Sequence, residues 1–290
     1  MRISVILSTY NQPAWLETVL WGYAFQSRRE FELIIADDGS STATAEVIKR
    51  TAGTFGLNLT HVWHEDRGFR KCEILNRALL AASGEYIIFS DGDCIPRSDF
   101  VETHARLATP RRFLSGGYLK LPYEVSARIE LDDVRSGRFA KLGWLRRQGW
   151  EPGRRAVRLL GSPLLTSLLD HLTPTAATWN GHNASTWHDA LIEVNGFEHE
   201  MKYGGEDRAL GERLENLGVR GVQIRHRAPV LHLDHGRPYI DQDALDRNRA
   251  IRDRIALHRE VRARRGLDEM RSDLDEACIT RRLDQLQGNS

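Results

Sequence analysis

The chain has 290 residues, of which 41 % are apolar and 28 % are charged, and its formal net charge is +1. These values are ordinary for a globular protein and exclude collagen, coiled-coil rods and wholesale disorder. The near-neutral charge argues against a nucleic-acid-binding protein, and the length suffices for one large domain or two closely packed halves.

The sequence gives no sign of a membrane span or of export. No apolar run approaches the roughly 18 residues of a membrane-spanning helix. The N-terminus runs directly into a strand pattern without a separate signal segment, so we expect a cytoplasmic location. The cysteines Cys72, Cys94 and Cys278 are odd in number and widely spaced, which predicts neither a disulfide framework nor a zinc cluster.

The first ninety residues alternate between strand and helix patterns. Short apolar runs predict buried strands at residues 3–9, 31–36, 57–63 and 85–90. Helical spacing predicts helices over residues 14–26, from about 41 to 53, and over 71–83. This order predicts an α/β fold with a mostly parallel, Rossmann-like sheet and flanking helices, in which ligands bind at the carboxyl ends of the strands.

The second half is less regular. A strand pair is expected within residues 113–122, a helix over 208–217 and short strands at 219–224 and 230–233. Residues 179–207 are rich in Gly, Asn, His and aromatic residues, which suits a ligand-lining region. From residue 241 onward Arg alternates with acids and apolar residues recur at helical spacing, so we expect a helical C-terminal tail.

Asp91-Gly92-Asp93 is the sharpest local signal in the chain. Two carboxylates two residues apart, directly after a buried strand, can both reach one hard cation, and the glycine lets the backbone approach closely. A divalent ion there could neutralise a diphosphate and improve it as a leaving group. A polar turn at the end of a strand explains the same residues without any function.

Other polar groups stand between predicted strands and helices. Asp38 can accept hydrogen bonds from a nucleotide base or ribose, although residues 37–40 also suit a turn with a helix cap. Arg67 and Arg70 precede a helix, where arginine can bind phosphate or simply belong to a charged surface.

An acidic pair and two histidines come late in the chain. Glu206 and Asp207 lie at a loop-to-helix junction, where a fixed carboxylate can act as a general base. Acids at that position also stabilise a helix N-terminus without any further role. His232 and His235 could supply one or two ligands to a metal such as Mn²⁺, although a buried histidine is more often structural.

Several motifs, taken in order, resemble a known family. They are ISVILSTYN, IIADDGS, RGFRKCEILNRALLAASGEYIIFSDGDC and GGED. Together they are similar to the inverting nucleotide-sugar glycosyltransferases of family 2, which have the GT-A fold, and the likeness covers residues 1–108 closely. Residues 179–235 also resemble the C-terminal part of the β-1,4-galactosyltransferases through NGHNAS, VNGFEHEMKYGGED and HLDH.

The resemblance assigns a nucleotide site. Ser8 and Tyr10 match residues of a uracil pocket with Thr9 beside them, and Asp38 matches the carboxylate that reads the pyrimidine. Arg70 matches a basic residue on the nucleotide, and Asp91 a residue near ribose and metal. The nucleotide-binding set is therefore Ser8, Thr9, Tyr10, Asp38, Arg70 and Asp91.

The same likeness implies the catalytic and metal positions. Asp207 matches the general base and Glu206 a group that binds a sugar hydroxyl. Asp93 and His235, with Asp91, match the ligands of a Mn²⁺ or Mg²⁺ ion. The residues expected to face the sugar or acceptor are Tyr203, Gly205, Glu206, His182 and Asn183. His232 stands where the galactosyltransferases have methionine, which leaves its role as a ligand open.

The implied function is metal-dependent transfer of a sugar from a UDP-sugar (galactose, glucose or an N-acetylhexosamine) to an acceptor hydroxyl in polysaccharide, lipopolysaccharide or another glycoconjugate. The implied division is a nucleotide-sugar-binding half at 1–108, an acceptor-binding and catalytic half at 109–240, and a helical tail at 241–290.

A nucleotidyltransferase or pyrophosphorylase would instead carry a Gly- and Lys-rich loop after the first strand, which STYNQPAW is not. A catalytically silent sugar-nucleotide-binding module would not need the acids at 91, 93, 206 and 207.

Residues 135–158 are strongly basic, with eight basic residues and one acid, and contain two tryptophans. An apolar stretch follows at 159–172. Cationic side chains beside aromatic ones suit an anionic membrane surface, so a peripheral membrane contact and a lipid-linked acceptor would fit. A solvated face over buried tryptophans also explains the pattern. The sequence leaves the oligomeric state open.

Overall fold

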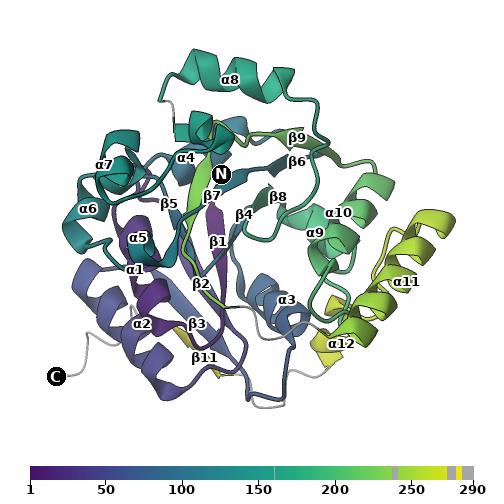
Figure 1. Cartoon of the computed structure of the whole chain (residues 1–290). Helices are drawn as coiled ribbons and strands as arrows, with labels where there is room; N and C mark the ends of the chain where they lie inside the picture. The colour runs from purple at the N-terminus through teal and green to yellow at the C-terminus, as the bar shows by residue number, and fades with distance from the viewer. Residues whose placement is uncertain (160, 237–240, 273–278, 283–290) are drawn as a thin grey trace.

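The first 91 residues form the alternating strands and helices that the sequence predicts (Figure 1). The computed structural model describes residues 1–159, 161–236, 241–272 and 279–282. Its first elements are β1 (Ile3–Thr9), α1 (Pro13–Ala24), β2 (Glu32–Asp37), α2 (Thr42–Phe55), β3 (Leu59–Trp63), α3 (Lys71–Ala81) and β4 (Tyr86–Asp91). Helix α2 continues beyond Gly53 and ends at Gly56, whose left-handed backbone (φ 61°) suits a helix stop.

The central sheet, in the described part of the chain, has eight strands in the order β11-β3-β2-β1-β4-β8-β6-β9. Strand β1 pairs in parallel with its neighbours β2 and β4. The pairs β2–β3 and β6–β9 are also parallel. Strand β8, in contrast, runs antiparallel to both β4 and β6. The register places Ser8 beside Asp91 and Thr9 beside Asp37. The polar residues that end these strands therefore meet at one edge of the sheet.

Helices cover both faces of this sheet, because alternate strand residues point to opposite sides. Val5 and Leu7 of β1 join a core with residues of α1 and α2, while Ile6 joins a second core with residues of α3 and α10 (Glu206–Asn216). This is the layered arrangement expected of a mostly parallel sheet (Figure 1).

The strands of the second half extend the sheet and add a smaller one. These elements are β5 (Cys94–Pro96), α4 (Phe100–Leu107), β6 (Arg112–Ser115), β7 (Gly117–Lys120), β8 (Asn183–Trp187), α9 (His188–Glu193), β9 (Arg220–Gln223) and β10 (Pro229–His232). The expected strand pair within 113–122 is wrong: β6 lies in the central sheet, but β7 lies in a three-stranded sheet with β5 and β10. The chain changes sheets at Gly116, where a Cβ atom would lie 2.0 Å from Oδ1 of Asn183.

Short helices fill residues 123–172. They are α5 (Tyr123–Ser126), α6 (Leu131–Arg135), η1 (Arg138–Ala140), α7 (Leu142–Arg147), η2 (Arg154–Leu159) and α8 (Pro163–Leu172). Trp144 and Trp150 are buried, so the aromatic side chains of this basic segment belong to the core, as the alternative of a solvated face proposes. Within the described ranges, no helix has both the length and the apolar character needed to cross a bilayer.

The C-terminal tail is helical only in part. It contains α11 (Gln242–His258) and α12 (Leu267–Ser272), as expected, but also a strand, β11 (Ile279–Arg282), which pairs antiparallel with the edge strand β3. The expected tail helices are present as α11 and α12, and β11 is an addition that the sequence pattern does not indicate, because backbone pairing at a free sheet edge does not require an apolar strand pattern. Cys278 lies outside the described residues.

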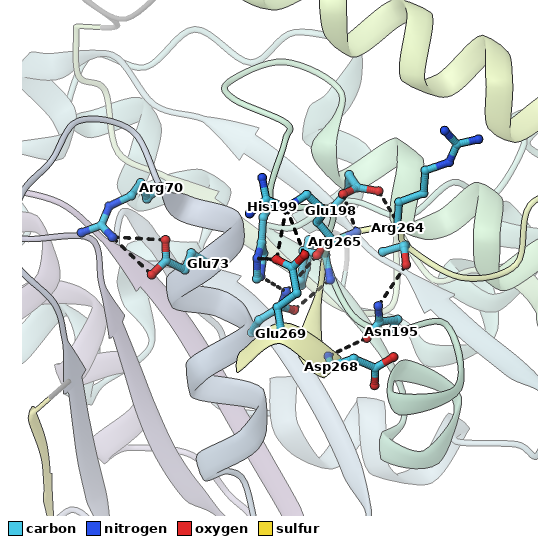
Figure 2. A network of polar contacts seen from close by, with 12 residues as sticks. Arg70, Glu73, Asn195, Glu198, His199, Arg264, Arg265, Asp268 and Glu269 are labelled. Carbon is cyan, nitrogen blue, oxygen red and sulfur yellow. Dashed lines mark hydrogen bonds and ion pairs between the residues drawn. The ribbon is translucent and has the colours of Figure 1, made fainter. Parts of the chain in front are cut away.

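Polar contacts fix the tail to the turn at residues 195–199 (Figure 2). The Glu198 carboxylate accepts hydrogen bonds from the backbone N–H groups of Arg264 (2.9 Å) and Arg265 (3.0 Å). Oδ1 of Asn195 accepts one from the N–H of Asp268 at 2.9 Å. These bonds hold the tail against the loop that leads into α10. The central sheet contains strands from all three predicted ranges, and the division at 108 and 240 stays a prediction.

Candidate functional site

A cavity of about 410 Å³ opens at the carboxyl edge of the central sheet. Its size is that of a small-molecule site. Its wall is formed by the ends of β1 and β4, the turn after β2, the start of α3, the start of α10 and the segment after β10. The lining residues are Ser8, Thr9, Tyr10, Gln12, Asp38, Gly68, Phe69, Lys71, Ile74, Asp91, Gly92, Asp93, Tyr203, Glu206, Asp207, His232 and His235.

Asp91, the last residue of β4, is held by two side chains. Ser8 donates its hydroxyl to Oδ1 of Asp91 at 2.5 Å, and Nζ of Lys71 lies 3.2 Å from the same oxygen. Burial opposes ionisation of Asp91, but the Lys71 charge and the Ser8 hydrogen bond outweigh it and lower the pKa of Asp91 to about 2. Asp91 is therefore a carboxylate, and Lys71 is a cavity cation that the sequence analysis did not assign.

Asp38 lines the cavity with both carboxylate oxygens already engaged. Nε2 of His64 lies 2.8 Å from Oδ1, and the backbone N–H of Arg70 donates to Oδ2 at 3.0 Å. The guanidinium of Arg70 pairs with Glu73 at 3.1 Å (Figure 2) and is not part of the cavity wall. Arg70 thus supports the site through its backbone, and the nucleotide contact of its side chain stays a prediction.

The Asp93 carboxylate and two imidazoles meet at one end of the cavity. The N–H of Leu233 donates to the backbone carbonyl of Asp93 at 2.8 Å, which holds the end of β10 against the acidic motif. Oδ2 of Asp93 lies 2.7 Å from Nε2 of His235 and 3.7 Å from Nε2 of His232. The two imidazole rings stack with their centroids 5.4 Å apart.

These groups suit a divalent ion. Asp93, Cys94 and His232 each offer a ligand atom, and the three atoms lie within 4.8 Å of one another. Nδ1 of His232 is buried and has no hydrogen-bond partner among the described residues. Carboxylate and imidazole donors fit Mn²⁺, and His232 is close enough to share the ion with His235 and Asp93.

Glu206 and Asp207 form the first turn of α10. Gly204 and Gly205 precede them with φ angles of 107° and 98°, a left-handed backbone that glycine adopts without strain. The Gly204 N–H donates to Oε2 of Glu206 at 2.9 Å. Burial raises the pKa of both acids, the neighbouring Asp207 charge raises that of Glu206 further, and the Lys71 cation opposes both shifts.

The backbone of Gly181 lies against the Asp207 carboxylate. A Cβ atom at residue 181 would lie 2.6 Å from Oδ1 and 2.7 Å from Oδ2 of Asp207, so only glycine leaves room for this carboxylate. Oδ1 of Asp207 is buried and accepts no hydrogen bond from the described part of the chain. Asp207 nevertheless lines the cavity, so its carboxylate can meet the hydroxyl of a ligand there.

Asn248, on α11, holds the loop in front of the acidic pair. It is buried, and its Nδ2 donates to the carbonyl oxygens of Lys202 at 2.8 Å and Gly204 at 2.9 Å. A third contact reaches the carbonyl of Tyr203 at 3.3 Å. Nothing in the Arg-rich sequence around Asn248 indicates that this residue holds the loop.

The residues expected to face the sugar or acceptor differ in position. Tyr203 and Glu206 line the cavity, whereas Gly205, His182 and Asn183 are not among its lining residues. Asn183 uses its side-chain N–H groups on the carbonyls of residues 117 and 228. Burial lowers the pKa of His182 to about 4, so its imidazole is neutral at pH 7. The acceptor roles of these residues stay predictions.

Residues 4–117 match the model of glycosyl transferase family 2. The chain is 27 % identical over 231 residues to validoxylamine A glucosyltransferase of Streptomyces hygroscopicus subsp. jinggangensis (strain 5008), an alignment that covers 75 % of this chain and 52 % of the relative. It is 23 % identical over 252 residues to chondroitin synthase of Escherichia coli, covering 78 % and 35 %. The chain thus spans about half the length of the first relative and about a third of the second.

Two solved structures share the fold. The mannosyltransferase PcManGT from Pyrobaculum calidifontis, in complex with GDP-Man and Mn²⁺, has a TM-score of 0.58 and 22 % identity, covering 89 % of this chain and 64 % of that one. A 1–349 fragment of S. aureus TarS with UDP-GlcNAc has a TM-score of 0.61 and 16 % identity, covering 93 % and 69 %. These two likenesses confirm the GT-A fold, and the likeness to glycosyl transferase family 2 covers residues 4–117.

Proposed function

We propose that this chain transfers a sugar from a UDP-sugar to the hydroxyl group of a glycan or lipid-linked acceptor, with inversion at the anomeric carbon. One observation carries the proposal: the same cavity is lined by Asp207 and by the acidic motif at Asp91 and Asp93. A proton acceptor and a diphosphate-binding group in one cavity are what a displacement at a nucleotide sugar requires.

Asp207 acts as the general base in this proposal. The acceptor hydroxyl donates to the Asp207 carboxylate, and the proton moves there as the acceptor oxygen bonds to the anomeric carbon. The bond from that carbon to the diphosphate breaks on the opposite side, and its electron pair leaves with the diphosphate. Burial raises the pKa of Asp207, which makes the carboxylate a stronger base than an exposed aspartate.

Asp93 and His235 would hold a Mn²⁺ or Mg²⁺ ion, and Nε2 of His232, 3.7 Å from Oδ2 of Asp93, is close enough to contribute. Such an ion, when bound, supplies positive charge to the leaving diphosphate. Lys71 adds a fixed cation between Asp91 and the acidic pair of α10. Its charge keeps Asp91 ionised and limits the repulsion among the three carboxylates.

UDP is proposed as the nucleotide because the sequence motifs resemble a uracil pocket at Ser8 and Tyr10, and because TarS is solved with UDP-GlcNAc. The solved complex of PcManGT with GDP-Man makes a guanine nucleotide the control ligand. The proposed setting is polysaccharide, lipopolysaccharide or other glycoconjugate synthesis in the cytoplasm.

A donor screen tests this function. The purified chain is incubated with Mn²⁺ and a panel of UDP- and GDP-sugars, and the products of slow donor hydrolysis are separated. We expect UDP and free sugar from at least one UDP-sugar. Release of sugar phosphate would instead indicate a pyrophosphorylase. Absence of both products, with UDP still bound, would indicate a silent binding module.

A further inference from the structure

Three arginines gather around Tyr118 of β7. Cζ of Arg155 lies 5.6 Å from the centroid of the Tyr118 ring, and Nη1 of Arg158 donates to the Tyr118 carbonyl at 2.6 Å. Arg225, from the segment after β9, lies close enough to repel both guanidinium groups. We call Arg155, Arg158 and Arg225 the arginine cluster.

Asp170, an acid whose charge attracts Arg158 and Arg225, has other partners. None of the three members of the arginine cluster forms an ion pair within the described ranges, and Asp170 is already engaged by His226 at 2.9 Å and Arg227 at 2.8 Å. Burial and the charge of the other two arginines lower the pKa of Arg158 to about 10. Like charges held together in this way are stabilised when an anion binds between them.

The cluster lies next to the candidate active site. The Tyr118 ring meets the His182 ring edge-on at 4.8 Å and the His232 ring at 5.7 Å, and His232 lines the cavity. One aromatic ring therefore separates the arginines from the candidate metal ligands. An anion on the arginine cluster would therefore lie one aromatic ring away from the candidate metal ligands.

An exposed apolar face lies beside the cluster. Helix α8 exposes Leu164 (86 %), Leu168 (54 %) and Leu172 (67 %), which are spaced four residues apart and so share one side of the helix. Asp170 lies on the opposite, buried side, where it anchors α8 through Arg227. In Figure 1 α8 lies at the periphery of the molecule, at the top of the view.

We propose that the arginine cluster binds the phosphate group of a membrane lipid while the leucine face of α8 enters the bilayer surface. Arginine forks bind phosphate oxygens in pairs, and leucines on one helix side with cationic neighbours are typical of helices that lie in a membrane interface. The inference rests on the proposed function, because it names the acceptor class: a lipid that carries a phosphate close to the hydroxyl to be glycosylated.

This surface uses only the last part of the basic and apolar ranges that the sequence suggests, with Arg225 added. Arg146 and Arg147 belong to α7, next to the buried Trp144 and Leu145, and none of the large apolar side chains of α7 that the structure describes is exposed. Charge complementarity and exposed leucines occur together at η2 and α8 instead. A bilayer explains both features at once, whereas a soluble phosphorylated acceptor explains only the arginines.

Vesicle flotation of the full chain tests the inference without any donor. Vesicles of phosphatidylcholine alone are compared with vesicles that also contain phosphatidic acid, at low and moderate salt. We expect binding to the anionic vesicles only. The double substitution R155S/R225S should weaken it about tenfold or more, since each basic residue near an anionic surface contributes about fivefold. The triple substitution L164S/L168S/L172S should also weaken it, because it removes the apolar side chains that enter the bilayer surface.

Substitutions on α11 provide matched controls. Arg249 and the exposed Leu257 lie on that helix, so R249S and L257S should leave vesicle binding unchanged. Thermal stabilisation by UDP with Mn²⁺ shows that each variant is folded and reports the donor site separately.

Failure of the wild-type chain to bind anionic vesicles, or equal losses in the controls, would overturn the inference. Stabilisation by inorganic pyrophosphate that R155S/R225S abolishes, without vesicle binding, would indicate a soluble phosphorylated acceptor and also overturn it.

Discussion

The two walls of the cavity are built in different ways. One wall consists of strand ends: Ser8 and Asp91 are neighbours in the register of β1 and β4, and Asp38 follows β2 next to them. The other wall consists of the first turn of α10, whose Asp207 depends on Gly181 for space and whose approach loop depends on Asn248. Many backbone hydrogen bonds fix the first wall, whereas a few contacts from distant parts of the chain fix the second.

This difference suggests a division of labour. The strand-end wall is preformed and carries the groups proposed to bind the donor. The loop-built wall carries the proposed base, whose position must be held to a fraction of an ångström for proton transfer. Substitutions in the two walls should therefore separate donor affinity from turnover.

The largest effect is expected from loss of the candidate metal site, which lies beside the strand-end wall. Asp93→Ala removes the carboxylate that lies 2.7 Å from His235, so metal-dependent UDP binding should disappear and turnover with it. Calorimetric titration of UDP with and without Mn²⁺ measures this directly. Full activity of the wild-type chain in excess chelator would show that the donor site works without a metal.

Asp207→Asn should separate the walls most sharply. The amide keeps the shape of the side chain but cannot take the proton, so kcat should fall about 10²–10⁴-fold. UDP affinity should change little, because the base acts in the transition state. Glu206→Gln is the control for removing one buried acid from the pair. A larger loss of kcat in Glu206→Gln than in Asp207→Asn would mean that the two roles are reversed.

The same difference between locally built and distantly built walls explains how far the sequence could predict each of them. The ends of β1, β2 and β4 were predictable because apolar runs and the polar residues behind them are local signals. Gly181 and Asn248 carry no local signal: their roles exist only once the chain brings them to Asp207 and to the loop at 202–204. Lys71 looked like an ordinary basic residue at a helix start.

The fold shows the same limit. The apolar stretch at 113–122 was read as one strand pair, although Gly116 sends its halves into different sheets because of the packing against Asn183. Strand β11 was missed because it forms by backbone pairing to β3 within an Arg-rich tail. Tertiary contacts decide both cases, and composition does not reveal them.

Gly181→Ala tests whether the loop-built wall depends on close packing. The added Cβ atom would lie 2.6 Å from Oδ1 of Asp207 and must push the carboxylate aside. A shift of about 1 Å should lower kcat by up to about 10²-fold with UDP affinity retained. Gly153→Ala is the matched control, since a Cβ atom there meets nothing within 4 Å. Unchanged kcat in Gly181→Ala would argue that Asp207 is not held in one position for catalysis.

The smallest effect is expected at Asn248, which touches no proposed ligand and acts through the loop before Glu206. Asn248→Ala leaves the carbonyls of Lys202 and Gly204 without a donor, so stability should fall by about 1–3 kcal/mol. A positioning role predicts more than that: kcat should also fall several-fold while KM for the donor stays constant.

Asn216→Ala is the control for Asn248→Ala. Asn216 joins α10 to the α11 segment through the carbonyl of Glu260 at 2.9 Å and does not touch the loop. Equal losses of stability in both variants, with kcat lowered only in Asn248→Ala, would establish that α11 supports the proposed base. Equal kcat values would reduce Asn248 to a structural contact and weaken the distinction between the two walls.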